Sequence, residues 1–209
     1  PRHDRLVNQE DKIILIMPTW RKNIASKLNE DLKRTYNSQF VNTQYFKMYS
    51  SLINNEKLLR KLREKNYKVK FVIHPALKEQ TKDFKPNDRV EIINPDSIKY
   101  YKLFNEASLL VTDYSSVAFD FAYLRKPIIY FQFDQEEFFN SHFPSGYFNY
   151  KEMGFGSVIT SFDQMVEELI SSLENNCRLP EKYKERIDRF FAYNDHNNSQ
   201  RVYDAIKKL

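Results

Sequence analysis

The chain contains little glycine, cysteine or tryptophan. Its 209 residues include three glycines, one cysteine (Cys177) and one tryptophan (Trp20). So few glycines leave little room for phosphate-binding glycine loops, and neither a P-loop nor the Gly-x-Gly-x-x-Gly fingerprint of dinucleotide-binding proteins occurs. A single cysteine excludes an internal disulfide framework and a thiolate metal cluster, so we expect a reducing, cytosolic setting.

Long apolar runs and metal-binding patterns are missing as well. No segment approaches the roughly 18 apolar residues that a membrane span needs, and no charged-then-apolar signal peptide opens the chain. The histidines His3, His74, His142 and His196 are scattered without the spacing of a ligand set, so we expect neither a metal nor another cofactor. The chain begins abruptly at "PRHDRL" without an initiator methionine, and we expect it to be a piece of a longer protein.

What remains is the composition of a globular chain with an excess of positive charge. Hydrophobic residues make up 41% and aromatic residues 15%, enough to bury a sizeable core in one domain. The net charge is +5, but the 33 basic residues are spread among 28 acidic ones. Phosphorylated small molecules and an anionic membrane surface therefore fit as partners as well as nucleic acid does. Because most aromatic residues fall within apolar periodic runs, we assign them to the core and expect no nucleic-acid partner.

Short apolar runs alternate with segments of helical periodicity. Strands are expected within residues 12–20, 67–75, 89–94, 108–112, 126–131 and 156–160. Helices are expected at residues 42–66 (two in succession), 98–107, 117–124, 163–174, 181–193 and 199–208, with a long aromatic loop at 132–155. Strands separated by helices of crossover length indicate a parallel sheet covered on both faces. The pattern predicts the α/β class, with a single Rossmann-like, three-layer domain over residues 1–209 and a mostly parallel sheet.

Polar residues gather where the expected strands end, and ligands of such sheets bind beyond the carboxyl ends of the strands. The stretches concerned are "PTWR", "HP", "TDYSS" and "FDQEEF". In "TDYSS", Asp113 and a serine are good helix N-caps, and the free N–H groups at a helix start suit an anion. The candidate ligands of a diphosphate are Thr112, Asp113, Ser115 and Ser116. The plainer alternative is that these residues only cap the helix.

The other strand ends carry further candidates. His74 ends a strand just before a proline, and Arg21 follows "PTW"; an imidazole N–H and a guanidinium can both hold a phosphate. Asp120, about one turn into the expected helix, and Asp134, after the fifth strand, are carboxylates that suit a ribose diol. Each has a plainer alternative as a structural histidine, a surface ion pair or a solvated acid. Convergence on one crevice favours a site.

These motifs together resemble the C-terminal half of the CDP-glycerol:poly(glycerophosphate) glycerophosphotransferases, the teichoic-acid polymerase family of Gram-positive bacteria. The resemblance covers nearly the whole chain, from "PRHDRL" through "MPTWR", "FVIHP" and "LFNEASLLVTDYSSVAFDFAYLRKPIIYFQFD" to "NNSQRVYDAI". It implies the donor-binding, C-terminal half of a two-domain GT-B fold. It also implies that His74 is a catalytic residue near the donor phosphates, that Arg21 and the "TDYSS" turn bind these phosphates, and that Asp120 contacts the ribose.

The resemblance further implies a transferase. It would move glycerol phosphate or ribitol phosphate from a CDP-activated donor to a growing, lipid-linked teichoic-acid or capsule polymer and release CMP, in the cytoplasm at the inner surface of the membrane. Two departures from the family stand out. We expect the chain to lack the family's N-terminal GT-B domain, with its acceptor contacts and a second histidine, and therefore to bind the donor with little or no transfer. In addition, Asp195-His196 stands where the family has an Asp-Gly pair.

Two other functions fit the same sequence. A nucleotide-sugar glycosyltransferase, or an epimerase of the same architecture, would use the same crevice. A non-catalytic module that binds an anionic polymer or a membrane surface would use a basic face instead.

Overall fold

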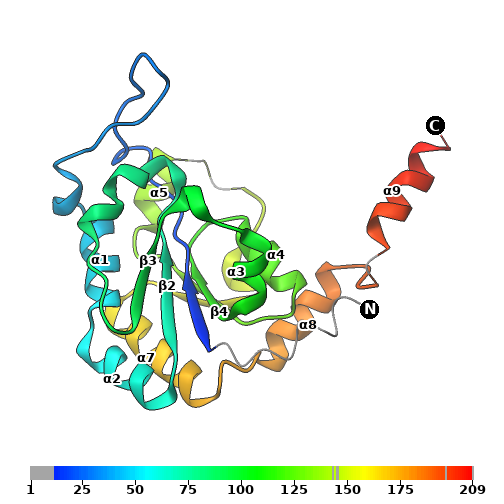
Figure 1. Ribbon diagram of the computed structural model, residues 1–209. Helices are drawn as coiled ribbons and strands as arrows, with labels where there is room; N and C mark the ends of the chain where they lie inside the picture. The colour runs from blue at the N-terminus through cyan, green and yellow to red at the C-terminus, as the bar shows by residue number, and fades with distance from the viewer. Residues whose placement is uncertain (1–11, 143, 145, 196, 209) are drawn as a thin grey trace.

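A six-stranded sheet forms the middle of three layers, with helices on both of its faces (Figure 1). This computed structural model describes residues 12–142, 144, 146–195 and 197–208. The strands are β1 (Ile13–Ile16), β2 (Lys68–Val72), β3 (Val90–Ile93), β4 (Ala107–Thr112), β5 (Ile128–Phe131) and β6 (Gly156–Ile159), in the spatial order β3-β2-β1-β4-β5-β6. Every neighbouring pair is parallel, which confirms the predicted Rossmann-like α/β class.

Helices follow most of the strands and cover the sheet. The α-helices are α1 (Gln44–Ile53), α2 (Glu56–Lys65), α3 (Tyr100–Glu106), α4 (Val117–Tyr123), α5 (Gln135–Ser141), α6 (Tyr150–Met153), α7 (Phe162–Glu174), α8 (Glu181–Phe190) and α9 (Asn198–Ile206); the 3-10 helices are η1 (Phe40–Asn42), η2 (Pro75–Asp83) and η3 (Pro95–Ser97). Helix α2 shows how the sequence sets such boundaries. The Asn55 side chain accepts the N–H of Leu58 at its start, and Asn66 ends it in the left-handed conformation at a φ of 57°.

Two apolar cores form because side chains alternate between the two faces along each buried strand. Ile14 and Ile16 of β1 belong to the core under α1, α2 and α7, whereas Leu15 and the following Met17 belong to the core under α3, α4 and α8. Each fully buried aliphatic side chain of this kind stabilises the fold by about 1.5–3 kcal/mol. The two cores fix the sheet, and the sheet fixes the positions at which its strands end.

The sequence pattern misses several short helices. The predicted loop at residues 132–155 contains α5 and α6, so the assignment of one long loop is wrong. The pattern also misses η2, which follows β2 almost directly. The two α-helices have seven and four residues, too few to display a helical period. The six predicted strands and the longer helices are confirmed, although α8 ends at Phe190 and not at residue 193. The "PRHDRL" segment and His196 lie outside the described residues.

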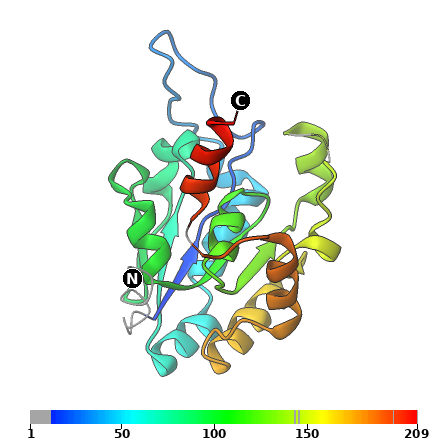
Figure 2. The same cartoon turned by 90° about the vertical axis from the view of Figure 1, so that its right-hand side faces the viewer.

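Helix α9 stands off the body of the domain in Figure 1, and in the view of Figure 2 it lies in front of the domain. None of its described side chains is buried, and Val202 and Ile206 are 59% and 63% exposed. No helix in the described part of the chain has the length and apolarity that crossing a membrane requires.

Gly156 marks a place where the sheet has no room for a side chain. A Cβ at this position would lie 1.8 Å from the carbonyl oxygen of Ile128 on β5. The substitution Gly156→Ala must push β6 away from β5, so we expect it to lower the free energy of unfolding by at least about 2 kcal/mol. Gly146→Ala is the matched control, because its Cβ would meet nothing within 4 Å. Urea denaturation followed by circular dichroism checks both, and equal stabilities would contradict the close packing of β6.

Candidate functional site

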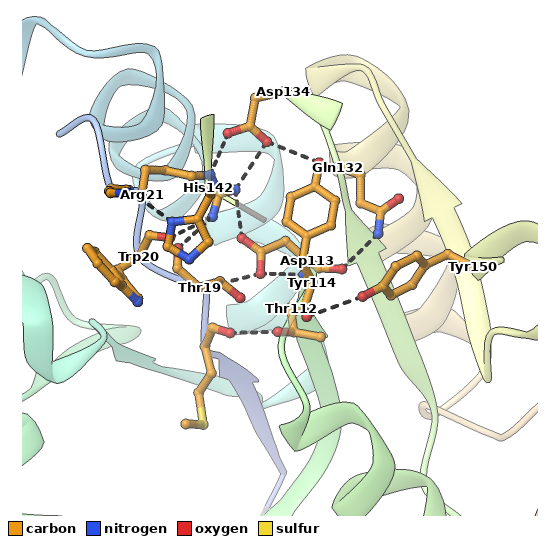
Figure 3. A network of polar contacts seen from close by, with 12 residues as sticks. Thr19, Trp20, Arg21, Thr112, Asp113, Tyr114, Gln132, Asp134, His142 and Tyr150 are labelled. Carbon is orange, nitrogen blue, oxygen red and sulfur yellow. Dashed lines mark hydrogen bonds and ion pairs between the residues drawn. The ribbon is translucent and has the colours of Figure 1, made fainter. Parts of the chain in front are cut away.

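The chain reverses its direction across the sheet at β1. It moves outward from β1 to β2 and β3 on one side, then returns to β4, β5 and β6 on the other. The connections that follow β1 and β4 therefore diverge, and such a switch point opens a crevice at the carboxyl edge of the sheet. The "PTWR" and "TDYSS" motifs follow these two strands and lie side by side (Figure 3).

A buried ion cluster joins the two motifs to the segment after β5 (Figure 3). Arg21 donates from Nε to Asp134 Oδ2 at 2.7 Å, and from Nη2 to Asp113 Oδ2 at 2.8 Å and Asp134 Oδ1 at 3.1 Å. Its Nη1 donates to the carbonyl of Thr19 at 2.7 Å. Burial alone would lower the pKa of the Arg21 guanidinium, but the charges of Asp113 and Asp134 outweigh burial and raise it. Arg21 is therefore a permanent cation held between two carboxylates.

Aromatic rings enclose the cluster. The guanidinium carbon of Arg21 lies 5.4 Å, 5.1 Å and 4.8 Å from the ring centroids of Tyr45, Tyr114 and Phe138. Tyr114 stacks on Phe138 with centroids 3.8 Å apart, and its hydroxyl donates to Asp134 at 3.2 Å. The rings keep water out, and the ion pairs are stronger in this low-dielectric setting.

Asp113 links the turn after β4 to the segment after β1 instead of capping α4. Its Oδ1 accepts the N–H groups of Thr19 at 2.9 Å and of Tyr114 at 2.6 Å. The N-cap of α4 is Ser116, whose side chain makes no capping bond, and Ser115 Oγ accepts the first helical N–H at 3.4 Å. The alternative that Asp113 and the serines only cap the helix therefore fits Ser115, but the side chains of Asp113 and Ser116 make no capping bond to α4.

A cavity of about 450 Å³ opens beside the cluster. It is lined by Thr19, Trp20, His74, Tyr114, Ser115, Ser116, Phe138, Phe139, His142, Pro144, Gly146, Phe148 and Tyr150. Pockets of roughly 300–1,000 Å³ hold small molecules. The aromatic walls suit a flat ring, and the hydroxyls and imidazoles suit an anionic group. The described residues contain no group of three or more His, Cys, Asp or Glu side chains placed to hold a metal ion.

His74 enters this cavity from the start of η2. Its Nδ1 accepts the N–H of Ala76 at 3.1 Å, and its ring stacks on Trp20 with centroids 6.1 Å apart and an angle of 27°. Burial lowers the pKa of His74 below the ordinary value of 6.5, although the charge of Asp113 opposes this shift. Neutral His74, with Nδ1 acting as acceptor, carries its proton on Nε2 and offers a hydrogen-bond donor there.

The predicted site residues thus fall into separate groups. His74, Ser115 and Ser116 line the cavity, where a ligand can reach them. As ligand contacts these three residues stay predictions, and the structure gives them the surroundings that the prediction needs.

The remaining five predicted residues lie elsewhere. Arg21, Asp113 and Asp134 form the buried cluster, in which their polar atoms bind one another and nearby main chain. Thr112 is buried and donates from Oγ1 to a carbonyl oxygen just after β1 at 2.7 Å. Asp120 is exposed on α4 and is not among the described residues that line the cavity. As ligand contacts these five also stay predictions, but their geometry favours support of the site over contact with a ligand.

Sequence reasoning missed several residues of the site, namely Trp20, Tyr114, Gln132, His142 and Tyr150. The Gln132 side chain donates to the carbonyl of Asp113 at 2.8 Å, and the Tyr150 hydroxyl donates to the carbonyl of Tyr114 at 3.2 Å (Figure 3). These bonds fix the turn after β4. The signal that could have revealed these residues is their place after strands and in short helices, outside the long periodic runs.

The fold and the site define a class of protein. In the part of the chain that the structure describes, the sheet is wholly parallel, and an aromatic cavity of ligand size lies at its switch point. This arrangement is typical of Rossmann-like domains, whose ligands bind at the carboxyl edge of the sheet. The chain belongs to the CDP-glycerol:poly(glycerophosphate) glycerophosphotransferase family, whose model matches residues 2–208. The resemblance seen in the motifs is confirmed.

Named relatives agree with this family. The chain is 43% identical to the minor teichoic acid biosynthesis protein GgaB of Bacillus subtilis (strain 168), over 100% of this chain and 23% of GgaB. It is 26% identical to the teichoic acid glycerol-phosphate primase of the same strain, over 99% of this chain and 46% of the primase. The chain therefore spans less than half the length of either relative.

Solved structures agree on the fold. The wall teichoic acid polymerase TagF aligns with a TM-score of 0.61 at 21% identity, over 99% of this chain and 47% of TagF. The UDP-GlcNAc 2-epimerase of Neisseria meningitidis aligns with a TM-score of 0.51 at 12% identity, over 100% of this chain and 47% of the epimerase. Both likenesses support the Rossmann-like α/β fold of the chain.

Removal of the Arg21 charge tests the buried cluster. Arg21→Met leaves Asp113 and Asp134 buried without their cation, so we expect a loss of about 3–5 kcal/mol in the free energy of unfolding. Arg63→Met is the matched control, because Arg63 makes the same two-pronged contact with Asp88 while both side chains are 44% and 55% exposed. We expect that change to cost less than about 1 kcal/mol. Urea denaturation measures both, and similar losses would show that Arg21 is no more important than a surface ion pair.

The two cavity histidines predict a pH dependence of folding. Burial lowers the pKa values of His74 and His142 below 6.5. Between the lowered pKa values of the folded chain and the ordinary value of 6.5 in the unfolded chain, the unfolded chain therefore binds more protons than the folded chain. The stability that the neutral histidines contribute is fully present above pH 6.5 and is lost as the pH falls through their pKa values in the folded chain. In the double variant His74→Asn, His142→Asn, the amide oxygens can replace both Nδ1 acceptors but cannot be protonated. Its free energy of unfolding should change less between pH 6.5 and about pH 5 than that of the wild type; equal slopes in urea titrations would contradict the assignment.

Proposed function

We propose that this chain is the donor-binding domain of a transferase that moves glycerol phosphate or ribitol phosphate from a CDP-activated donor to a teichoic-acid or capsule polymer. The observation that carries the proposal is the cavity shared by His74, Ser115 and Ser116 in a member of this family. A solved structure of a TagF variant soaked with CDPG fits the same donor class.

The donor phosphates are assigned to the edge of the cavity formed by the turn after β4 and η2. The hydroxyls of Ser115 and Ser116 and the Nε2–H of His74 are neutral donors that can offset the charge of a diphosphate. The cytosine ring is assigned to the aromatic wall, where Trp20, Phe138 and the neighbouring rings supply flat apolar surface.

The reaction follows from this placement. An acceptor hydroxyl oxygen bonds to the β-phosphorus while the bond from that phosphorus to the bridging oxygen breaks, and CMP leaves with the bonding electrons. Such a transfer depends mainly on positioning and on stabilisation of charge. Because His74 Nδ1 accepts the N–H of Ala76, the neutral ring donates from Nε2, and we assign this donor to the phosphates of the CDP-activated substrate. We assign the removal of the acceptor proton to a group in another domain of the full-length protein.

The partner and location follow from the same assignment. The acceptor is a polyol-phosphate polymer carried on a lipid, which would place the enzyme at the cytoplasmic surface of the membrane. The net charge of +5 supports attraction to an anionic polymer or membrane surface. The second domain of a GT-B enzyme would hold the acceptor.

Nucleotide titration tests the proposal. Isothermal titration calorimetry should show CDP binding to the wild type with higher affinity than UDP. The double variant His74→Ala, Ser115→Ala loses two hydrogen-bond donors, so we expect its Kd for CDP to rise at least about tenfold.

Two outcomes separate the proposal from its rivals. Lys57→Ala with Lys184→Ala is the control, since these lysines make exposed ion pairs on α2 and α8 and do not line the cavity. If the lysine variant loses affinity while the His74, Ser115 variant keeps it, the chain is an anion-binding module. Equal or stronger binding of UDP would favour a nucleotide-sugar enzyme, and no binding of CDP at all would refute the proposal.

A further inference from the structure

His142 lies in the same cavity as His74, although no sequence motif contains it. It follows the last residue of α5, and its ring lies against Trp20 with centroids 4.7 Å apart and the rings nearly perpendicular. The ring centroid of His142 also lies 4.9 Å from that of Phe138 on α5. His142 therefore fills the space between the segment after β1 and helix α5.

One hydrogen bond of His142 joins these two parts of the chain. Its Nδ1 accepts the main-chain N–H of Lys22 at 3.0 Å, across 120 residues of sequence. The bond requires the Nδ1 lone pair, so it exists only in the neutral ring, whose proton is then on Nε2. The imidazole thus acts as an acceptor that holds the main chain two residues beyond Trp20.

Trp20 is the part of the cavity wall that this bond can control. Its indole stacks on His74 on one side, and the guanidinium of Arg34 lies 4.8 Å from its centroid. The position of the indole therefore sets how much room a ligand has beside His74. Its neighbour Arg21 is fixed by the buried cluster, but Lys22 is exposed.

A second bond in the same region serves as a comparison. The side chain of Asn23 donates to Glu137 on α5. It joins the same segment to the same helix, yet neither residue lines the cavity. Of these two hydrogen bonds, the one made by His142 involves a side chain that also contacts Trp20 and lines the cavity.

We propose that His142 is a positioning residue of the donor site, which holds Trp20 against His74 through its acceptor bond to the Lys22 main chain. The inference rests on the proposed function, since it assigns the cavity to the nucleotide donor. His142 acts through Trp20 and takes no part in the transfer itself. Its loss should therefore weaken the binding of the donor and leave the chemistry of the transfer step unchanged.

Substitution of His142 by asparagine or by glutamine distinguishes this positioning role from a direct contact between His142 and the ligand. In His142→Asn, the amide oxygen lies close to the place of Nδ1 and can still accept from Lys22. In His142→Gln, the longer side chain places its amide near Nε2 and loses the bond to Lys22. His142→Phe keeps the packing between Trp20 and Phe138 and removes both nitrogens, and Asn23→Ala is the matched control.

Trp20 is the only tryptophan in the sequence, so its fluorescence reports directly on the wall. In the ligand-free protein, His142→Phe and His142→Gln should shift the emission to longer wavelength as the indole becomes more exposed, whereas His142→Asn and Asn23→Ala should match the wild type. In calorimetric titrations with CDP, loss of this one hydrogen bond should raise the Kd about fivefold in the Phe and Gln variants. The Asn variant and the Asn23 control should stay within about twofold of the wild type.

The results separate a failure of this inference from a failure of the proposed function. If the wild type binds CDP and all four variants share its Kd and emission, His142 has no positioning role. If Gln restores binding and Asn does not, His142 contacts the ligand through Nε2 and the positioning role is wrong. If the wild type binds no CDP, the proposed function fails and this inference fails with it, whatever the emission of Trp20 shows.

Discussion

The buried charge of Arg21 is the constraint on which the rest of the site depends. An arginine residue that is only 3% exposed must find its counter-charges inside the protein, because an unpaired buried ion costs several kcal/mol. Its partners Asp113 and Asp134 lie 92 and 113 residues further along the chain. All three can meet only when β1, β4 and β5 are neighbours in the native order. We infer that the cluster contributes more to the choice of one arrangement of these connections than to net stability.

The same cluster shapes the electrostatics of the cavity. Two free carboxylates beside the cavity would repel an anionic ligand, but here both are paired with Arg21, which offsets one of their two negative charges, and both lie below a layer of aromatic rings. The groups that face the cavity are hydroxyls and histidines whose pKa values are lowered by burial. An anionic ligand therefore meets neutral donors, and the fixed charges hold the donors in place from behind.

The sequence predicts the fold better than the partners of the polar residues. Strands such as Leu109 to Val111 are continuous apolar runs, and such runs can be recognised from the local sequence without knowledge of long-range contacts. Which polar groups pair with one another depends on strand order and register, which the local pattern does not contain. Arg21 and Asp134 are thus recognised as strand-end residues, yet their mutual bond is invisible in the sequence. His142 is missed for the same reason, since its partner Lys22 is 120 residues away.

The scarcity of glycine is explained by how the turn after β4 is held. Glycine serves phosphate loops by allowing the main chain to approach the ligand closely or to adopt a positive φ. No described residue between Asp113 and Ser116 has a positive φ, and the turn is fixed by side chains: Asp113 accepts the N–H of Tyr114, and Gln132 donates to the carbonyl of Asp113. The serine hydroxyls extend beyond the main chain, so in the proposed site the side chain is the contact and not an obstacle. A hydrogen bond from a side-chain hydroxyl can be removed by substituting one serine while the turn itself stays folded. A glycine loop that binds through main-chain N–H groups does not allow such a substitution.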